Sequence, residues 1–251
     1  MELELSGKRA LVTGSSRGIG FAIAKRLLAE GCSVALNGRD GAALTAAAQS
    51  IGAATSVVGD VTDADEARRV VAAAAAALGG LDIVICNVGS GRSVPPGDET
   101  PEEWQRVFAM NLWSTTNTVA AARAWLEKSQ GAIVCVSSIC GVELIPEAPV
   151  TYSAAKAALH AYVRGIARPL ARHNVRINGV APGNILFDGS VWANKLAADP
   201  AKVEALLERD VALRRLGSPE DIAGLVAFLA SARAAFATGS IWTLDGGQVH
   251  S

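Results

Sequence analysis

The sequence predicts an α/β fold in which helices cover both faces of a doubly wound parallel β-sheet. Short apolar runs alternate along the 251 residues with longer segments whose alanine content and apolar spacing favour helices. Several of the short runs are almost wholly apolar, which is expected of strands that are buried on both faces. The repeated strand–helix–strand order is typical of a parallel sheet.

The predicted sheet has about seven strands. They are expected at residues 9–13, 33–37, 56–58, 81–86, 131–136, 176–181 and 240–244. The helices between them are expected at residues 18–30, 42–51, 63–78, 101–126, 152–172 and 219–231. Two helix starts are marked by an N-cap residue, a proline and acids, at Thr100 and Ser218. Because no linker or repeat interrupts the alternation, we expect residues 1–251 to form a single domain.

The composition argues against several classes of protein. Hydrophobic residues make up 50% of the chain and charged residues 19%, which disfavours disorder. A formal net charge of −1, with no dense block of Lys and Arg, gives no reason to expect nucleic acid or an anionic membrane as a partner. The longest apolar run, residues 70–81, is mostly alanine and too short to span a bilayer, and the N-terminus lacks a signal-peptide pattern. We therefore expect a soluble cytoplasmic protein.

The cysteine and histidine spacing gives no indication of a metal site. The four cysteines form no C-x-x-C pair, and the three histidines are scattered along the chain. Buried, reduced thiols are the expected state of the cysteines.

A glycine-rich turn, T-G-S-S-R-G-I-G at residues 13–20, follows the first predicted strand and opens the first predicted helix. Gly14 suits the tight turn, and Gly18 and Gly20 let the backbone and the helix approach a pyrophosphate. The N–H groups and the dipole at a helix N-terminus attract such an anion. An ordinary glycine-rich turn is the alternative, but the position in a strand–helix unit favours dinucleotide binding. The sheet is thus predicted to be of the Rossmann type.

Tyr152 and Lys156 are the central candidates for chemistry. They are four residues apart, so on a helix they share one face. A free phenol has a pKa of about 10, and a nearby ammonium lowers that pKa. Tyr152 can then give a proton to a carbonyl oxygen or take one from an alcohol. The pair alone arises often by chance, but a predicted strand that ends in Ser137 and Ser138 lies before it, with Ser138 fourteen residues ahead of Tyr152.

Together, these motifs resemble the classical short-chain dehydrogenase/reductase family, including its 3-oxoacyl-ACP reductase-like members. The resemblance spans essentially the whole chain and includes the glycine turn, the S-S strand end, Y-x-x-x-K and P-G at residues 182–183. Where the family has N-N-A-G, this chain has C-N-V-G at residues 86–89. The resemblance implies an NAD(P)(H)-dependent oxidoreductase that interconverts a carbonyl and a secondary alcohol by hydride transfer, with Tyr152 as general acid/base.

The resemblance also implies the roles of individual residues. Four catalytic residues are implied: Asn111, Ser138, Tyr152 and Lys156. In the family, Asn111 holds a water that links Lys156 to a proton relay; a helix kink without catalytic role is the alternative for Asn111. The implied cofactor-binding residues are Gly14, Ser16, Arg17, Gly18, Ile19, Gly20, Arg39, Asp60, Val61, Asn87, Gly89, Tyr152, Lys156, Pro182, Gly183 and Ile185.

The end of the second predicted strand bears on the choice of cofactor. An acid that would accept hydrogen bonds from a ribose 2′-OH is missing at Gly38. Arg17 and Arg39 instead offer two guanidinium groups that suit a 2′-phosphate. Both arginines could also be solvated surface charges, and Asp40 is a competing partner for Arg39. We expect NADP(H) to be preferred, with NAD(H) as the alternative cofactor.

Residues 184–216 are expected to form a substrate lid with a helix over residues 200–208, because insertions at the carboxyl ends of parallel strands build binding sites. Within the lid, Phe187 stands where relatives often have a threonine that contacts the carboxamide or the phosphates, and Asn184 or backbone groups are candidate substitutes. Arg92 is a candidate for an anionic substrate group or a solvated loop residue. Pro169 predicts a kink in, or an early end to, the helix over residues 152–172.

The expected partners are a small-molecule carbonyl/alcohol substrate and further copies of the chain. The family usually forms tetramers, and T-L-D-G-G at residues 243–247 matches its C-terminal signature, so we expect a homotetramer or a dimer. Substrate classes that stay open are 3-oxoacyl thioesters, ketones and sugars. The alternative function is a catalytically silent NADP(H)-binding or regulatory protein with the same fold. A nucleotide-sugar epimerase is disfavoured because the region after Gly183 is short.

Overall fold

The computed structural model describes residues 2–52 and 55–250 and contains one seven-stranded sheet in the order β3-β2-β1-β4-β5-β6-β7. Every neighbouring pair of strands is parallel. The strands are β1 (Arg9–Val12), β2 (Ser33–Gly38), β3 (Thr55–Val58), β4 (Ile83–Cys86), β5 (Ala132–Val136), β6 (Arg176–Pro182) and β7 (Ile241–Leu244). The predicted doubly wound parallel sheet is confirmed, and each strand falls within a few residues of its expected range.

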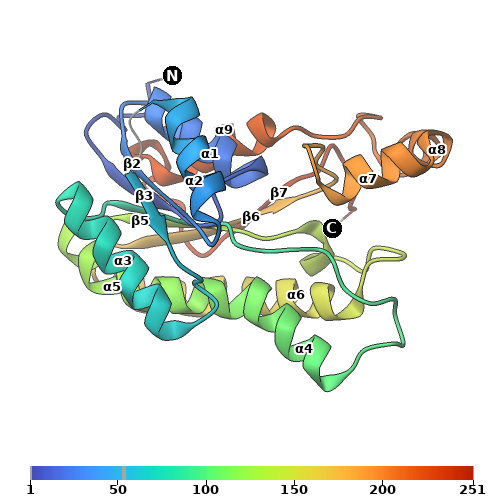
Figure 1. The fold of residues 1–251 in the computed structure, drawn as a ribbon, viewed down its shortest axis with the longest axis horizontal. Coiled ribbons are helices and arrows are strands. Elements are labelled where there is room, and N and C mark those ends of the chain that lie inside the picture. Colours follow the sequence, from blue (N-terminus) through green and yellow to red (C-terminus); the bar gives the residue numbers. More distant parts are fainter. Residues whose placement is uncertain (1, 53–54, 251) are drawn as a thin grey trace.

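Helices cover both faces of this sheet (Figure 1). The helices are α1 (Gly18–Ala29), α2 (Gly41–Ile51), α3 (Ala64–Leu78), α4 (Pro101–Phe108), α5 (Ser114–Ser129), α6 (Val150–Ala171), α7 (Val191–Ala198), α8 (Pro200–Asp210) and α9 (Pro219–Ala230). One layer holds α1, α2 and α9, and the other holds α3, α5 and α6 (Figure 1). The helices α7 and α8 stand away from the sheet, at the right of Figure 1.

Alternation along the strands fills one apolar core on each face of the sheet. Leu11 and Val12 are both fully buried, but they belong to opposite cores because successive side chains of a strand point to opposite faces. The same holds for Val84 and Ile85 of β4. Strands β4 and β5 are buried along their whole length, which explains their purely apolar sequences. Among the described residues, none of the helices is both long and apolar enough to traverse a bilayer.

The single helix predicted over residues 101–126 is divided. It begins as α4, widens into a π-helical turn over Ala109–Trp113, and continues as α5 to Ser129. Such turns interrupt the regular i→i−4 ladder and are frequent at functional sites. The turn holds Asn111, one of the four candidate catalytic residues.

The sequence predicted a kink or an early end of the helix at Pro169, and the early end is wrong. Helix α6 runs through Pro169 to Ala171. Pro169 lies in the last turn, so its missing N–H and its steric clash affect only one turn of the backbone ladder. The fully buried side chain of Leu170 keeps that turn packed on the core.

Asp40 has a different role from the one considered for it. Its carboxylate caps α2 by accepting hydrogen bonds from the N–H groups of Ala42 and Ala43, each at 3.0 Å. Arg39 instead pairs with Asp60 across 3.4 Å. Asp60, and not Asp40, is therefore the carboxylate that would compete with a cofactor phosphate for Arg39.

Candidate active site

A cavity of about 2060 Å³ opens at the carboxyl ends of the strands. Its wall comes from the segments that follow β1 to β6, together with residues 184–212. Of the predicted site residues it brings together Gly14, Ser16, Arg17, Ile19, Arg39, Asp60, Val61, Asn87, Gly89, Ser138, Tyr152, Lys156, Pro182, Gly183 and Ile185. Gly18, Gly20 and Asn111 do not line it.

The glycine turn packs too closely for larger residues. Gly14 and Gly18 have φ values of +62° and +60°, in the left-handed region that favours glycine. A Cβ at Gly20 would collide with the Gly14 carbonyl and with the amide group of Asn87. Arg17 precedes α1 without a side-chain cap, so the first N–H groups of the helix have no capping side chain. This arrangement suits a phosphate group at the helix N-terminus.

Asn87 holds the glycine turn in place. Its side-chain nitrogen donates to the carbonyl oxygens of Thr13 at 3.1 Å and Gly14 at 2.9 Å, and its backbone N–H donates to the Thr13 hydroxyl. The turn is therefore built even though Cys86 and Val88 depart from the family's N-N-A-G pattern.

Arg39 and Asp60 form the outer edge of the cavity near the end of β2. The Arg39 side chain is 65% exposed, so its ion pair with Asp60 is weak. Burial raises the pKa of Asp60, but hydrogen bonds from Thr62 and the charge of Arg39 outweigh it and lower that pKa. A Cβ at Gly38 would lie 3.5 Å from Leu44 Cδ1 and 3.7 Å from the Ser16 hydroxyl, so a side chain at position 38 would be in ordinary contact with both.

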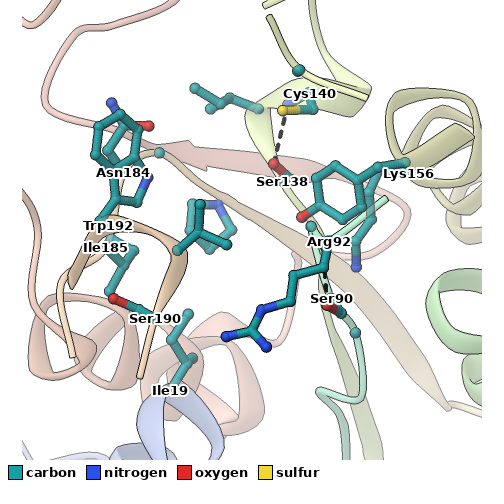
Figure 2. Close-up of a pocket in the computed structure, with 18 of the residues that line it drawn as sticks. Ile19, Ser90, Arg92, Ser138, Cys140, Lys156, Asn184, Ile185, Ser190 and Trp192 are labelled. Atoms are coloured by element: carbon teal, nitrogen blue, oxygen red, sulfur yellow. Dashed lines mark hydrogen bonds between the residues drawn. The ribbon is translucent and has the colours of Figure 1, made fainter. Parts of the chain in front are cut away.

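Lys156 is buried beside Tyr152 on α6. Its Nζ lies 5.8 Å from the centre of the Tyr152 ring and donates to the carbonyl oxygen of Val136 at 3.1 Å. The residue is 2% exposed, and this burial lowers the pKa of Lys156 to about 8. Lys156 and Ser138 lie on the same side of the pocket in Figure 2.

Tyr152 hydrogen-bonds with the side chain of Ser138. Burial raises the pKa of Tyr152, and the hydrogen bond with Ser138 opposes that rise only in part. The prediction that Lys156 lowers the pKa of Tyr152 below its ordinary value is therefore wrong for this geometry, because loss of solvation dominates. The phenol is the stable form of Tyr152 at neutral pH.

Asn111 fixes the loop after β4 to the π-helical turn. Its Oδ1 accepts from the N–H of Ser90 at 3.0 Å, and its Nδ2 donates to the carbonyl oxygens of Ser90 and Val107. A Cβ at Gly89 would lie 3.0 Å from Asn111 Oδ1 and 3.2 Å from Lys156 Nζ. Gly89 thus lets Asn111 and Lys156 approach the same stretch of backbone.

The first residues of the segment 184–216 cover the glycine turn. A Cβ at Gly18 would meet the Phe187 ring at 2.6 Å, so the ring rests on Gly18 and separates it from the cavity. Arg92 donates to the carbonyl oxygen of Gly189 at 3.4 Å. In Figure 2 its guanidinium points toward Ile19 and Ser190 and away from Ser138.

Sequence reasoning missed three side chains around the cavity. Asn37, the last residue but one of β2, lines the cavity and has a buried Oδ1 without a hydrogen-bond partner. Asn117 donates to the carbonyl of Thr62 at 3.0 Å and supports the loop after β3. His160 contacts Ser137 one helical turn beyond Lys156, and its spacing of four residues from Lys156 is a signal that the sequence carries. Among residues 2–52 and 55–250, no cluster of three potential His, Cys, Asp or Glu metal ligands occurs.

Comparisons with known proteins agree with this geometry. A family model described as enoyl-(acyl carrier protein) reductase matches residues 14–249. Gluconate 5-dehydrogenase of Gluconobacter oxydans is 36% identical, over 97% of this chain and 95% of the relative. The 3-oxoacyl-[acyl-carrier-protein] reductase of Chlamydia trachomatis is 35% identical, over 97% of this chain and 98% of the relative. The structure of L-sorbose reductase from Gluconobacter frateurii, complexed with NADPH and L-sorbose, superposes with a TM-score of 0.93 at 29% identity, covering 100% of both chains.

The fold, the cavity and these relatives define an NAD(P)-dependent oxidoreductase. The chain belongs to the classical short-chain dehydrogenase/reductase family, as its motifs predicted.

Proposed function

We propose that the chain is an NADP(H)-preferring enzyme that interconverts a carbonyl and a secondary alcohol, with Tyr152 as the general acid/base. The observation that carries this proposal is the arrangement around Tyr152 in the wall of the cavity. Its side chain hydrogen-bonds with Ser138, and the Lys156 ammonium lies 5.8 Å from its ring. Such a group can hold a substrate oxygen and move a proton to or from it.

In the direction of reduction, the phenol of Tyr152 gives its proton to the substrate oxygen. Its raised pKa keeps that proton in place at neutral pH, which is the form that reduction needs. Ser138 donates a hydrogen bond to the same oxygen and orients it toward Tyr152. The ammonium of Lys156 favours the phenolate that remains after proton transfer. In the direction of oxidation the same groups act in reverse.

The residues of the cavity fit a dinucleotide, which supplies the hydride when bound. The left-handed glycines and the uncapped start of α1 suit its phosphates. In this proposal, Asp60 and Val61 hold the adenine, Tyr152 and Lys156 hold the nicotinamide ribose, and Pro182, Gly183 and Ile185 bound the nicotinamide.

The preference for NADP(H) rests on the charge at the end of β2. Position 38, the last residue of β2, is a glycine, so it carries no acid that would repel a 2′-phosphate. Arg39 is exposed and held only by a 3.4 Å pair with Asp60, so it is free to turn to a phosphate. The NADPH complex of the Gluconobacter frateurii structure supports the same cofactor. NAD(H) stays the alternative.

Two substrate classes have support from relatives. L-sorbose reductase and gluconate 5-dehydrogenase favour a keto-sugar or its alcohol, and 3-oxoacyl-[acyl-carrier-protein] reductase favours a 3-oxoacyl thioester. The segment 184–216, with α7 and α8, is proposed as the lid that selects between them.

The test of the proposed function is NADPH consumption with L-sorbose, 5-ketogluconate and a 3-oxoacyl thioester, each repeated with NADH. At least one carbonyl should be turned over, and faster with NADPH. Tight NADPH binding without turnover of any carbonyl would instead support the silent, regulatory alternative.

We also propose a homotetramer or a dimer. Tryptophan side chains are partly exposed on two separate faces, at Trp125 of α5 (38%) and at Trp242 of β7 (36%), the edge strand of the sheet. Exposed aromatics of this kind are enriched in protein interfaces. Light scattering on the purified chain would show a mass of two or four times 25.7 kDa.

A further inference from the structure

His160 is a buried histidine on the same face of α6 as Tyr152 and Lys156. It is 3% exposed, and its Nε2 lies 2.7 Å from the hydroxyl oxygen of Ser137. Ser137 is itself 6% exposed, and its backbone N–H donates to the carbonyl of Val180 at 2.7 Å. His160 follows Lys156 by one helical turn, so Tyr152, Lys156 and His160 occupy one face of α6.

The backbone of Gly141 also acts on His160 and raises its pKa, as a carbonyl that accepts from the imidazole does. Ser137 and Gly141 are the two ends of one short segment that leaves β5 through a 3-10 turn. Ser138 lies within this segment and accepts a hydrogen bond from the N–H of Cys140 at 3.1 Å. The imidazole of His160 therefore ties down both ends of the segment that carries Ser138.

The same segment is pressed against α6. A Cβ at Gly141 would stand 2.6 Å from the backbone carbon of Lys156 and 2.8 Å from its carbonyl oxygen. Close packing leaves the segment no room to shift toward the helix, and His160 keeps it from moving away. The position of Ser138 relative to Tyr152 thus depends on a side chain that lines no part of the cavity.

We propose that His160 is a positioning residue that acts through Ser137 and Gly141 to hold the hydroxyl of Ser138 in register with Tyr152. This inference rests on the proposed function of Ser138 and Tyr152. A neutral imidazole has one donor and one acceptor, which matches two partners. Nε2 accepts from the Ser137 hydroxyl, and Nδ1–H donates to the Gly141 carbonyl.

The surroundings of His160 keep it neutral. Burial and the positive charge of Arg164, one turn further along α6, lower the pKa of His160 to about 4, and the charge of Lys156 acts in the same direction. The bridge is therefore intact over the whole neutral range. At neutral pH, His160 therefore holds neighbouring groups in position and does not transfer protons.

The experiment compares His160→Phe, His160→Gln and His160→Asn in the full-length protein. Phe keeps the ring but has neither hydrogen bond; Gln offers an acceptor near Nε2, and Asn offers a donor near Nδ1. His160→Phe should lower kcat for carbonyl reduction by about 10- to 10²-fold, since small misplacements of catalytic groups have effects of this size. The Kd for NADPH should stay within about twofold. His160→Gln and His160→Asn should each recover part of the rate.

Ser137→Ala is the partner test, because it removes one hydrogen bond and leaves His160 in place. The double variant Ser137→Ala/His160→Phe should be no slower than His160→Phe alone, since both changes remove the same contact. His173→Phe is the matched control: its side chain is 47% exposed, and the rate should stay parental.

Three outcomes would overturn the inference. The first is a His160→Phe enzyme with parental kcat and only a lower Tm. That result would mean that His160 stabilises the fold by packing but does not position Ser138. The second is additive rate losses in the double variant. The third is a ¹⁵N NMR spectrum of the parent protein in which the His160 imidazole carries its proton on Nε2 at neutral pH; this readout does not depend on whether any variant folds or shows turnover. A parental rate in Tyr152→Phe would instead contradict the proposed function. Failure of the His160 inference and failure of the proposed function are therefore distinguishable.

Discussion

The ring of Phe187 rests on Gly18, where a Cβ would lie only 2.6 Å from the ring. Gly18 is the first residue of α1, and it is the place where a dinucleotide phosphate is expected. The contact therefore sets an apolar side chain against the proposed phosphate site. The Phe187 ring is therefore expected to weaken cofactor binding.

Replacing Phe187 with threonine should strengthen NADPH binding. The change opens the N-terminus of α1 and adds a hydroxyl donor within reach of a phosphate, and a hydrogen bond to a charged group contributes about 1.5–3 kcal/mol. We expect the Kd for NADPH to fall by about tenfold in a fluorescence titration. An unchanged or weaker affinity would mean that Phe187 does not compete with the phosphates.

Arg39→Asp should weaken NADPH binding by about 10- to 10²-fold, because a charge-assisted hydrogen bond to the 2′-phosphate is lost and a like charge is introduced. Binding of NADH should change by less than about twofold. Arg68→Asp is the control, since the Arg68 side chain is also 65% exposed but lies on α3. Equal affinity of the parent protein for NADPH and NADH would refute the cofactor preference.

The rate should depend on pH through Lys156. Its pKa of about 8 means that the ammonium is present below that pH and lost as the pH rises through it. We expect kcat/KM for carbonyl reduction to fall as the pH rises through about 8, and the fall should shift to higher pH in Lys156→Arg because a guanidinium keeps its proton. A flat profile between pH 7 and pH 9 would speak against a role for the ammonium.

The lowered pKa of Lys156 also means that its burial destabilises the folded chain at neutral pH. Its pKa is lower in the folded chain than in the unfolded chain, so between about pH 8 and pH 10.5 the unfolded chain holds the extra proton and stability rises with pH. Lys156→Met should therefore raise the free energy of unfolding at pH 7 by roughly 2 kcal/mol, and the gain should shrink toward pH 10. Urea unfolding of both proteins at the two pH values measures this. A loss of stability at pH 7 would contradict it.

Local patterns predicted most of the fold. The apolar runs and the alternating helical segments placed all seven strands, because burial on both faces leaves a strand few polar residues. The glycine turn was equally predictable, since its positive φ angles require glycine at Gly14 and Gly18.

Features that depend on distant contacts were not predictable. The π-helical turn at Asn111 is held by the backbone of Ser90, 21 residues away, and nothing in its own residues marks it. Arg39 pairs with Asp60 because the carboxylate of Asp40 caps the N-terminus of α2. The direction of the Tyr152 pKa shift depends on how many parts of the chain exclude water around it, which spacing cannot reveal.

The most direct measurement is the steady-state rate of NADPH oxidation by Tyr152→Phe, with the Kd for NADPH measured in the same preparation. The account predicts a kcat lower by at least about 10²-fold, because the proton donor is gone, and a Kd within about twofold of the parent. A Tyr152→Phe enzyme that reduces a carbonyl at the parental rate would contradict it.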